Sequence, residues 1–390
     1  MPEPGPATLT LETCTSIDDI PARPWERLAG HSNPFLRYEF FQALEASGCT
    51  SEATGWSPSH LVFKSDDKIV GLAPAFLKSH SMGEYVFDWA WADAYQRHGL
   101  SYYPKLLIAI PFTPSAGPRL LLDPDLRQQL TAEQIHDLLD TLTDTLGAHS
   151  WHLLFPDSED QKLLHHDREL HRIGCQFHWH NHGYEDFDDF LSALASRKRK
   201  SIRKERKKVA DIGLDIRTLS GSELEERHWD AFFQFYMSTT DKKWGQSYLH
   251  REFFSMLGDR MPDSVVMVMA FDGERPVAGA LNLKGADCLY GRNWGALESH
   301  KFLHFECCYY RAIDYAIEHG LARVEAGAQG PHKVQRGYLP APVYSLHYIR
   351  DPGFEDAVGD FVMRERFQIE REMAAITEEY SPYRNEDGDG

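Results

Sequence analysis

Three ionisable residues in the second half of the sequence are of the right type and spacing for acyl transfer to an amine. His304 and Glu306 lie near the start of a segment with helical apolar spacing, and Glu325 lies near the end of the next predicted strand. Acyl transfer needs a base that takes a proton from the amine and donors that stabilise the oxyanion. We expect Glu306 or Glu325 to be the base, with His304 as orienter or proton relay. The alternative for each carboxylate is a buried group that bonds only to backbone.

A loop after that strand carries His332, Lys333 and Arg336, followed by Gly337. Gly337 permits a tight backbone turn, so these side chains are candidate contacts for an oxyanion or a phosphate. An ordinary surface loop is the alternative. Further residues are expected to line an acceptor groove: Trp244, Tyr290, Arg292 and Trp294. Strand alternation predicts that the last three share one face, although an aromatic stripe on a strand is more often core.

A strongly basic segment stands out in an acidic chain. The whole sequence of 390 residues has 41 Lys and Arg against 59 Asp and Glu, a formal charge of -18. Such a surface repels nucleic acid and anionic membranes on average, so a phosphate-bearing partner must meet a local basic patch. Residues 197–208 carry nine bases and one acid, Glu205. The bases are Arg197, Lys198, Arg199, Lys200, Arg203, Lys204, Arg206, Lys207 and Lys208.

We expect the segment 184–212 to be a helix whose sparse apolar stripe packs inward and whose bases bind a donor or acceptor. The stripe is Leu191, Leu194, Ile202 and Val209, and the binding candidates are Arg199, Lys200, Arg203, Lys204 and Lys207. The phosphates of coenzyme A, a tRNA acceptor stem or a nucleotide-linked substrate all fit this chemistry. A solvated helix with ordinary charges is the alternative.

Several function classes are not supported by the sequence. His178, His180 and His182 share a strand face, but no carboxylate or Cys is positioned to complete a metal site. The sequence contains no Walker loop, dinucleotide fingerprint or nucleophile elbow. No segment reads as a signal peptide or a transmembrane helix, and the six cysteines form no CxxC pair. These features predict a cytoplasmic protein without a permanently bound cofactor or metal.

The two halves of the sequence repeat a pair of landmarks. Residues 39–44 and 252–257 both begin Glu-Phe-Phe, and each precedes a hairpin-like segment, 67–78 and 272–284. The repeat favours a duplicated domain, although chance recurrence of common residues is the alternative. We expect domains at 1–183 and 211–380, joined by the basic helix at 184–210, with a flexible tail at 381–390.

Apolar periodicity and turn residues give an element order for each half. The second half reads as strand 214–219, helices 222–239 and 249–260, strands 264–271, 277–284 and 287–294, helix 302–319, strands 321–326 and 343–349, and a helix from Phe354. The first half reads more loosely, with strands at 8–13, 60–64, 69–78, 151–155 and 175–180 and an irregular stretch at 89–118. Three consecutive antiparallel strands, then a helix and a parallel crossover, indicate a GNAT-type α/β arrangement.

The residues Arg199–Arg206 resemble the basic helix of FemAB-like transferases. The stretches 303–310, 325–330 and 332–340, together with Asn33-Pro34-Phe35 and 102–117, resemble the bacterial predicted N-acyltransferase family that is labelled peptidoglycan biosynthesis or recognition. The resemblance implies tandem GNAT-like domains with mixed, mainly antiparallel sheets flanked by helices. It also implies an N-acyltransferase that moves an acyl or aminoacyl group from an activated donor to an amine acceptor such as a cell-wall precursor.

The sequence departs from ordinary GNAT enzymes at the loop before the central helix. Those enzymes hold the coenzyme A pyrophosphate there on backbone amides, whereas residues 295–301 read Gly-Ala-Leu-Glu-Ser-His-Lys. The departure favours aminoacyl-tRNA over acyl-CoA as co-substrate, with tRNA or a nucleotide-linked amine acceptor as partner. A catalytically inactive module that recognises a nucleotide-linked precursor or tRNA is the alternative function.

Overall fold

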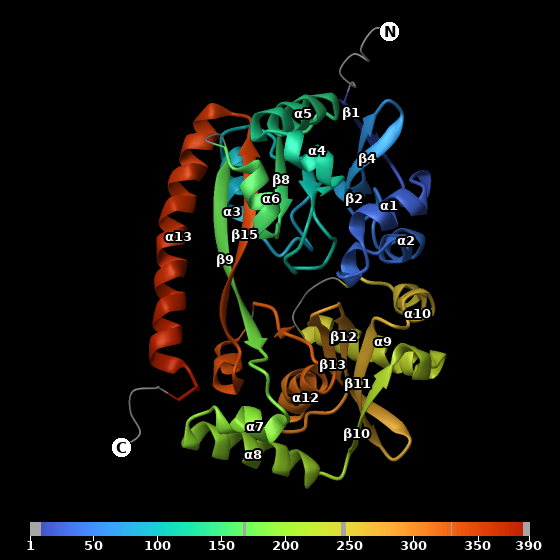
Figure 1. Ribbon diagram of the computed structural model, residues 1–390, viewed down its shortest axis with the longest axis vertical. Helices are drawn as coiled ribbons and strands as arrows, with labels where there is room; N and C mark the ends of the chain where they lie inside the picture. Colours follow the sequence, from blue (N-terminus) through green and yellow to red (C-terminus); the bar gives the residue numbers. More distant parts are fainter. Residues whose placement is uncertain (1–8, 167–168, 243–246, 329, 385–390) are drawn as a thin grey trace. The chain divides into compact units, whose positions relative to one another are not determined.

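The computed structural model describes residues 9–166, 169–242, 247–328 and 330–384. The chain forms two compact units, each built from two segments. Unit 1 comprises Met1–Gly174 and Val343–Ile369, and unit 2 comprises Cys175–Pro342 and Glu370–Gly390. The chain therefore passes from one unit to the other inside strand β9 (Leu170–His180), strand β15 (Leu339–Ile349) and helix α13 (Pro352–Tyr380), which are labelled in Figure 1.

Unit 1 contains two sets of paired strands. The first has the order β1 (Leu9–Cys14), β3 (His60–Ser65), β4 (Lys68–Ala73) and β7 (Leu121–Leu122), all antiparallel. The second has the order β2 (Trp56–Pro58), β5 (Ala75–Lys78), β6 (Lys105–Ile108), β8 (Ser150–Leu154) and β15, in which only the β6–β8 pair is parallel. The predicted single strand 69–78 is therefore wrong. It divides at Pro74, which has no N–H for a ladder, and its two parts join different sheets.

Helix α5 (Ala132–Thr145) shows how sequence shapes the core of unit 1. Thr131 begins the helix with a capping box, in which the Thr131 side chain accepts from Gln134 and the Gln134 side chain accepts from the Thr131 backbone. Ile135, Leu139 and Leu142 follow at helical spacing and are buried in a core cluster with strand β8. The other helices are α1 (Ala22–Ala29), α2 (Tyr38–Ala46), α3 (Trp89–Arg97), α4 (Pro124–Gln129) and α6 (Ser158–Leu164).

The stretch 89–118, predicted to be irregular, contains regular structure. Helix α3 buries Trp91 and Tyr95, which are four residues apart, and β6 follows it. Trp91 and Tyr95 pack with Tyr102, Val358 and other residues in a small core cluster of unit 1. The segment thus forms part of a packed layer, and its aromatic residues are largely core.

Unit 2 confirms the predicted order of strands. Strands β10 (Asp215–Ser220), β11 (Val265–Asp272), β12 (Arg275–Lys284) and β13 (Cys288–Ala296) are consecutive antiparallel neighbours. β13 then pairs in parallel with β14 (Arg323–Glu325), which is reached through the predicted central helix, and β14 pairs with β9.

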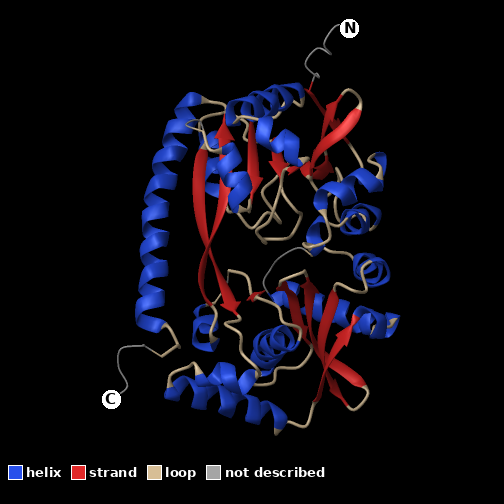
Figure 2. Cartoon of the chain, viewed as in Figure 1, coloured by secondary structure: helices blue, strands red, loops and turns tan. Residues whose placement is uncertain are grey.

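Helices cover both faces of this sheet (Figure 2). Helix α9 (Glu226–Lys242) approaches so closely at Gly295 that a Cβ there would lie 2.0 Å from the carbonyl oxygen of Phe235. On the other face, Leu289 of β13 is buried with Ile313 of helix α12 (Arg311–Glu318). Helix α10 (Arg251–Arg260) packs on α9. The glycine at position 295 is therefore required by the distance between helix and sheet.

The basic segment forms two helices, and the single predicted helix at 184–212 is wrong in this respect. Helix α7 (Phe187–Ser192) ends before a turn, and α8 (Ser196–Ala210) carries the bases. The C-terminal residues supply hydrogen-bond partners for the turn, since the Ala195 N–H donates to the Pro382 carbonyl at 2.8 Å and the Arg384 N–H donates to the Ala193 carbonyl at 3.1 Å. The predicted apolar stripe is confirmed: Leu191, Leu194, Ile202 and Val209 are all buried.

Candidate functional site

The site forms where two parallel strands separate. β14 pairs with β13 only from Cys288 to Tyr290, where Tyr290 lies beside Glu325. β13 then continues to Ala296, whereas the chain after Glu325 turns away through Gly327, whose φ is 72°. The ladder between β13 and β14 therefore ends at Tyr290 and Glu325, and we call the place where the two strands separate the strand gap. On its other side the chain still bonds to β9, since the Ala326 N–H donates to the Phe177 carbonyl and the Phe177 N–H donates to the Gly327 carbonyl.

A β-bulge at Arg292 shifts the alternation of β13 side chains between the two faces of the sheet. Leu281 pairs with Asn293 and Asn282 pairs with Gly291, so Arg292 is the extra residue. Trp294 lies opposite Ala280, while Tyr290 lies opposite Leu283. Because 280 and 283 are on opposite faces of β12, the prediction that Tyr290, Arg292 and Trp294 share a face is wrong. Trp244 lies outside the described residues.

The central helix contains a π-helical turn at Glu306–Tyr310, between α11 (Leu303–Phe305) and α12. Such turns are rare and are frequent at functional sites. The ring of His304 lies 5.3 Å from the rings of Trp294 and Tyr309 and 6.0 Å from the ring of His332. His304 thus belongs to an aromatic cluster at the start of this helix.

Glu306 lies among cations. Its Oε1 is 3.0 Å from Nη2 of Arg206 and 3.2 Å from Nε of Arg311. Burial raises the pKa of Glu306, and the charge of Arg206 opposes that rise. Glu306 and His304 are two residues apart on a helix, so their side chains point in different directions. Glu306 therefore accepts a hydrogen bond from Arg206 and forms an ion pair with Arg311.

Glu325 ends β14 at the point where the strands separate. Its Oε1 is 3.2 Å from Nε of Arg323, which also reaches Oδ2 of Asp287 at 2.8 Å. The carboxylate side chain is buried, and its charge contributes to the raised pKa of the neighbouring Tyr290 hydroxyl, for which burial is the main cause. Of the two predicted carboxylates, Glu325 is therefore the one at the strand gap.

The predicted loop 332–336 is a short 3-10 helix, η5 (Pro331–Arg336), between Gly330 and Gly337. Both glycines have positive φ, 99° and 92°, which confirms the expected tight backbone at Gly337. The buried ammonium of Lys333 donates to the carbonyl oxygens of Ala326, at 2.5 Å, and Gly327, at 3.1 Å. Lys333 therefore places a positive charge on the segment that leaves β14.

His332 and Arg336 extend the site from the strand gap to a cavity of unit 2. Nε2 of His332 lies 3.0 Å from the hydroxyl of Tyr309. The Arg336 guanidinium stacks 3.5 Å above the Phe305 ring and donates to the His332 carbonyl at 2.6 Å and to Oε2 of Glu205 at 2.8 Å. Nε of Arg336 is buried and has no hydrogen-bond partner among the residues that the structure describes.

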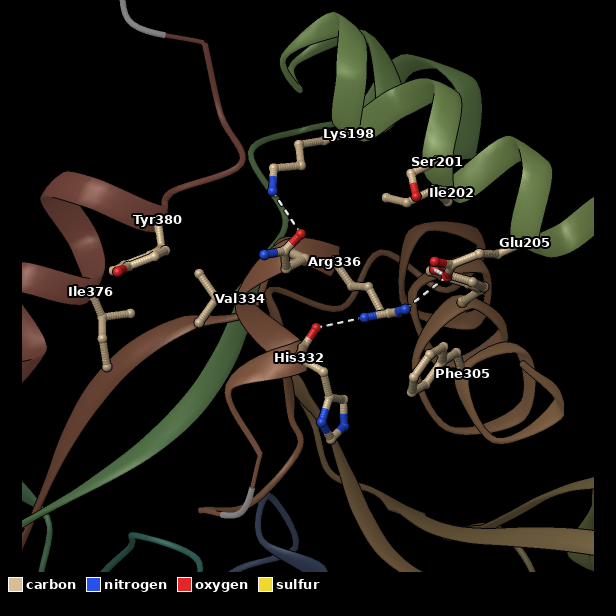
Figure 3. A pocket seen from close by; sticks show the side chains of 12 residues that line it. Lys198, Ser201, Ile202, Glu205, Phe305, His332, Val334, Arg336, Ile376 and Tyr380 are labelled. Carbon is tan, nitrogen blue, oxygen red and sulfur yellow. Dashed lines mark hydrogen bonds and ion pairs between the residues drawn. The ribbon is translucent and has the colours of Figure 1, made fainter. Parts of the chain in front are cut away.

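The cavity has a volume of about 430 Å³ and lies between α8, η5 and the end of α13 (Figure 3). Its lining combines apolar and polar side chains: Lys198, Ser201, Ile202, Glu205, Phe305, Tyr310, His332, Val334, Gln335, Arg336, Ile376 and Tyr380. Nζ of Lys198 donates to Oε1 of Gln335 at 2.6 Å. The cavity thus places the basic helix opposite η5.

The bases of α8 have different surroundings. Arg206 is held by Glu306 and by Asp314, at 2.7 Å, and stacks on Phe187. Arg203 pairs with Asp188 at the surface. The exposed bases of α8 include Arg197, Lys200, Arg203, Lys204, Lys207 and Lys208, while Arg199 is half-buried. Most of the predicted binding residues therefore face solvent, whereas Arg206 forms ion pairs with Glu306 and Asp314 of the central helix.

Sequence reasoning missed several residues in or beside this cavity. Glu205 accepts from both Arg336 and Tyr310 and so orients the guanidinium. Glu205 could have been noticed in the sequence, because it is the single acid among the basic residues 197–208. Phe305 and Tyr309, four residues apart, stack beside His332. Tyr380 comes from a distant helix, and no local pattern marks it.

The loop before the central helix holds a carboxylate. Glu298 accepts from Arg275 at 2.6 Å and lies 3.1 Å from Nε2 of His300. Phe302, at the helix start, has φ 70°. A negative side chain at this place is unfavourable for a pyrophosphate.

The histidines of β9 do not form a metal site with other described residues. The rings of His178 and His180 lie 6.4 Å apart on β9, and burial lowers the pKa of His178 to about 3. The described part of the chain holds no group of three or more His, Cys, Asp or Glu side chains arranged to hold a metal ion. Within the same residues, no helix is both long and apolar enough to cross a membrane.

Comparison with known proteins supports the fold and the family. No curated protein sequence matches the chain. FemX is similar in structure, with a TM-score of 0.52 at 11% identity over 87% of this chain and 98% of FemX. The C-terminal domain of a putative lysylphosphatidylglycerol synthetase from Agrobacterium fabrum has a TM-score of 0.52 at 8% identity, over 89% of this chain and 95% of that domain. A conserved protein of unknown function from Bacteroides thetaiotaomicron has a TM-score of 0.50 at 10% identity, over 84% and 97%.

Residues 16–385 match the FemAB-like family of peptidoglycan biosynthesis or recognition proteins. The match confirms the predicted family, and the similar structures confirm the predicted α/β fold with mainly antiparallel sheets flanked by helices. Because the match covers nearly all of the sequence, the chain belongs to the FemAB-like family.

Proposed function

We propose that unit 2 binds an activated acyl or aminoacyl donor, or a nucleotide-linked acceptor, between α8 and η5 and transfers the acyl group to an amine. The observation that carries this proposal is the buried Arg336, which lines a cavity opposite a basic helix and whose Nε has no hydrogen-bond partner within the described part of the chain. An unsatisfied buried donor of this kind is costly unless a ligand uses it. An anionic group of a substrate would satisfy it.

We assign roles at the strand gap from the same contacts. Lys333, held by two carbonyl oxygens at the end of β14, supplies positive charge for the oxyanion that forms when the amine attacks the acyl carbon. Glu325 is the candidate base, since Glu306 is held by two guanidinium groups. The His332–Tyr309 pair lies between the gap and the cavity and orients the substrate.

The exposed face of α8 favours an extended polyanion as ligand. Lys200, Lys204 and Lys207 are exposed, and Glu298 occupies the place of a pyrophosphate loop. An activated donor of the acyl-CoA or aminoacyl-tRNA type suits the family in general. Within that class we propose an aminoacyl-tRNA or a nucleotide-linked precursor in preference to acetyl-CoA.

Calorimetric titration at two salt concentrations tests the ligand class. If α8 contacts four phosphates, the slope of log affinity against log salt should be about −3 to −4 for a tRNA, and shallower for acetyl-CoA. Reversing Lys200, Arg203, Lys204 and Lys207 to Glu should abolish binding in a variant whose circular dichroism is unchanged. Reversal of four exposed bases outside α8, at Lys68, Lys162, Arg227 and Arg350, makes the same charge change and should retain most of the affinity.

Equal losses in both quadruple variants would show that net charge, and not α8, governs binding. Micromolar acetyl-CoA binding without measurable binding of tRNA or nucleotide-linked precursor at low salt would overturn our choice of donor. The acyltransferase class would still stand.

A non-catalytic binding module is the second candidate, and the ion-paired state of Glu306 is the observation in its favour. Variants His304→Ala, Glu306→Gln and Glu325→Gln distinguish the two functions. Loss of turnover with retained ligand binding supports the enzyme. Full cellular function in all three variants supports the binding module.

A further inference from the structure

A loop of unit 1 exposes aromatic side chains to solvent. Tyr85, Phe87 and Trp89 are 42%, 62% and 46% exposed, and we call residues 84–89 the aromatic loop. Between Ser81 and Ala92, the exposed residues are these three aromatics and Ala90. Monomeric proteins rarely leave large apolar side chains grouped at the surface without a partner.

The acids of this loop are turned inward, which explains why its aromatics point outward. Glu84 and Asp88 are buried and accept from the ammonium of Lys105, with 2.8 Å between Nζ and Oε2 of Glu84. Tyr102 also donates to Asp88, at 2.6 Å. Lys105 itself is 0% exposed and lies on β6, beside Lys78 of β5. The two acids of the aromatic loop are therefore neutralised inside the unit.

A neighbouring residue of α13 enlarges the aromatic surface. Nη1 of Arg172 donates to the Phe87 carbonyl at 2.9 Å, and its guanidinium lies 5.9 Å from the ring of Phe361. Phe361 is itself 37% exposed. The charge of Arg172 is met by Glu365 through two hydrogen bonds of 2.6 and 2.8 Å. The surface around Phe87 thus combines aromatic rings with a compensated ion pair.

We propose that the aromatic loop docks this protein on the interfacial region of a lipid bilayer. Tyr, Trp and Phe are the side chains that favour the headgroup level, where one end of the ring is apolar and the other is wet. A sugar ligand would need hydrogen-bonding side chains beside the rings, and the acids here are buried. A chain of net charge -18 is repelled by anionic headgroups, whereas the aromatic loop itself exposes no acid.

Co-sedimentation with phosphatidylcholine vesicles tests the proposal on the full chain. The wild type should bind these uncharged vesicles with little dependence on salt, which separates this contact from any contact through α8. Phe87→Ser with Trp89→Ser should lower the partition coefficient by about tenfold or more. Phe367→Ser is the matched control, because Phe367 on α13 is 64% exposed and lies outside the loop. The control should bind within about twofold of the wild type.

Three outcomes would overturn the proposal. The first is the absence of wild-type binding to phosphatidylcholine vesicles. The second is an equal loss in the Phe367→Ser control, which would indicate non-specific adsorption. The third is a dimer in light scattering that dissociates in the Phe87→Ser, Trp89→Ser variant, with no vesicle binding, which would assign the loop to a second copy of the chain.

Discussion

The buried charges beneath the aromatic loop make a sharp prediction for Lys105→Met. The Lys105 ammonium contacts Glu84, Asp88 and the Ser81 hydroxyl, the last at 3.1 Å. Removing one partner of a buried ion pair leaves an uncompensated charge, which typically costs about 3–5 kcal/mol. We therefore expect the free energy of unfolding of unit 1 to fall by about that amount at pH 8.5.

The loss should depend on pH with a defined sign. In the wild type, burial raises the pKa of Glu84 to about 7. Burial also acts to raise the pKa of Asp88, but the charge and hydrogen bond of Lys105 lower it to about 2. Without Lys105, burial acts on both carboxyls with less opposition, and their folded-state pKa values exceed the unfolded ones. The folded variant then binds more protons than the unfolded chain, so its stability falls as pH rises. The loss at pH 5 should be smaller than at pH 8.5.

Urea unfolding at these two pH values measures both quantities. Lys68→Met is the control, since Lys68 lies exposed on β4, and it should change stability by less than about 0.5 kcal/mol. A loss below about 1 kcal/mol at pH 8.5, or the same loss at pH 5, would refute the reasoning, because either result means that Lys105 is not what neutralises the two carboxylates.

Two further predictions follow from the buried polar groups. Lys333→Ala and Arg336→Ala should each lower transfer by ~10²-fold or more, beyond any effect on thermal stability, because each removes a positive charge at the strand gap or the cavity; a lower melting temperature with unchanged activity per folded molecule would contradict this. Wild-type stability should fall as pH drops below about 6.5, because burial lowers the pKa of His152 to about 3 and that of His347 well below its usual value, so the unfolded chain binds protons that the folded chain excludes. Each histidine adds a slope of up to about 1.4 kcal/mol per pH unit, while the raised pKa of Glu84 acts in the opposite direction over the same range. The same pH profile between 6.5 and 5 in a His152→Gln, His347→Gln variant would argue against the role of the histidines.

The sheet of unit 2 could be predicted because its signals are local. Alternation, the turn at Asp272-Gly273 and the helical spacing after Phe302 each lie within a few residues. The bulge at Arg292 could not be predicted from the sequence, because a bulge is defined by the pairing register of β13 with β12. The sequence does contain a signal for the break between β4 and β5, because Pro74 has no N–H for a strand ladder. The prediction of one strand instead followed the continuous run of apolar residues on both sides of Pro74.

The candidate site was predictable in its parts and not in its arrangement. The types and order of His332, Lys333 and Arg336 indicated a functional loop, and the structure puts all three on η5. The ion pairs that hold Glu306 join it to Arg206, 100 residues earlier in the chain. No short-range sequence pattern indicates such a contact. The choice of Glu325 over Glu306 as the proposed base therefore rests on the tertiary structure.

The three crossings of the chain between the units affect how the protein can fold during synthesis. Unit 1 requires β15, which pairs with β8, and unit 2 requires residues 382–384, whose backbone binds the turn between α7 and α8. Neither unit has all of its strands and contacts until most of the sequence has left the ribosome. A chain that ends before β15 has been made therefore exposes an unpaired β8 edge, and an edge of this kind is prone to aggregation.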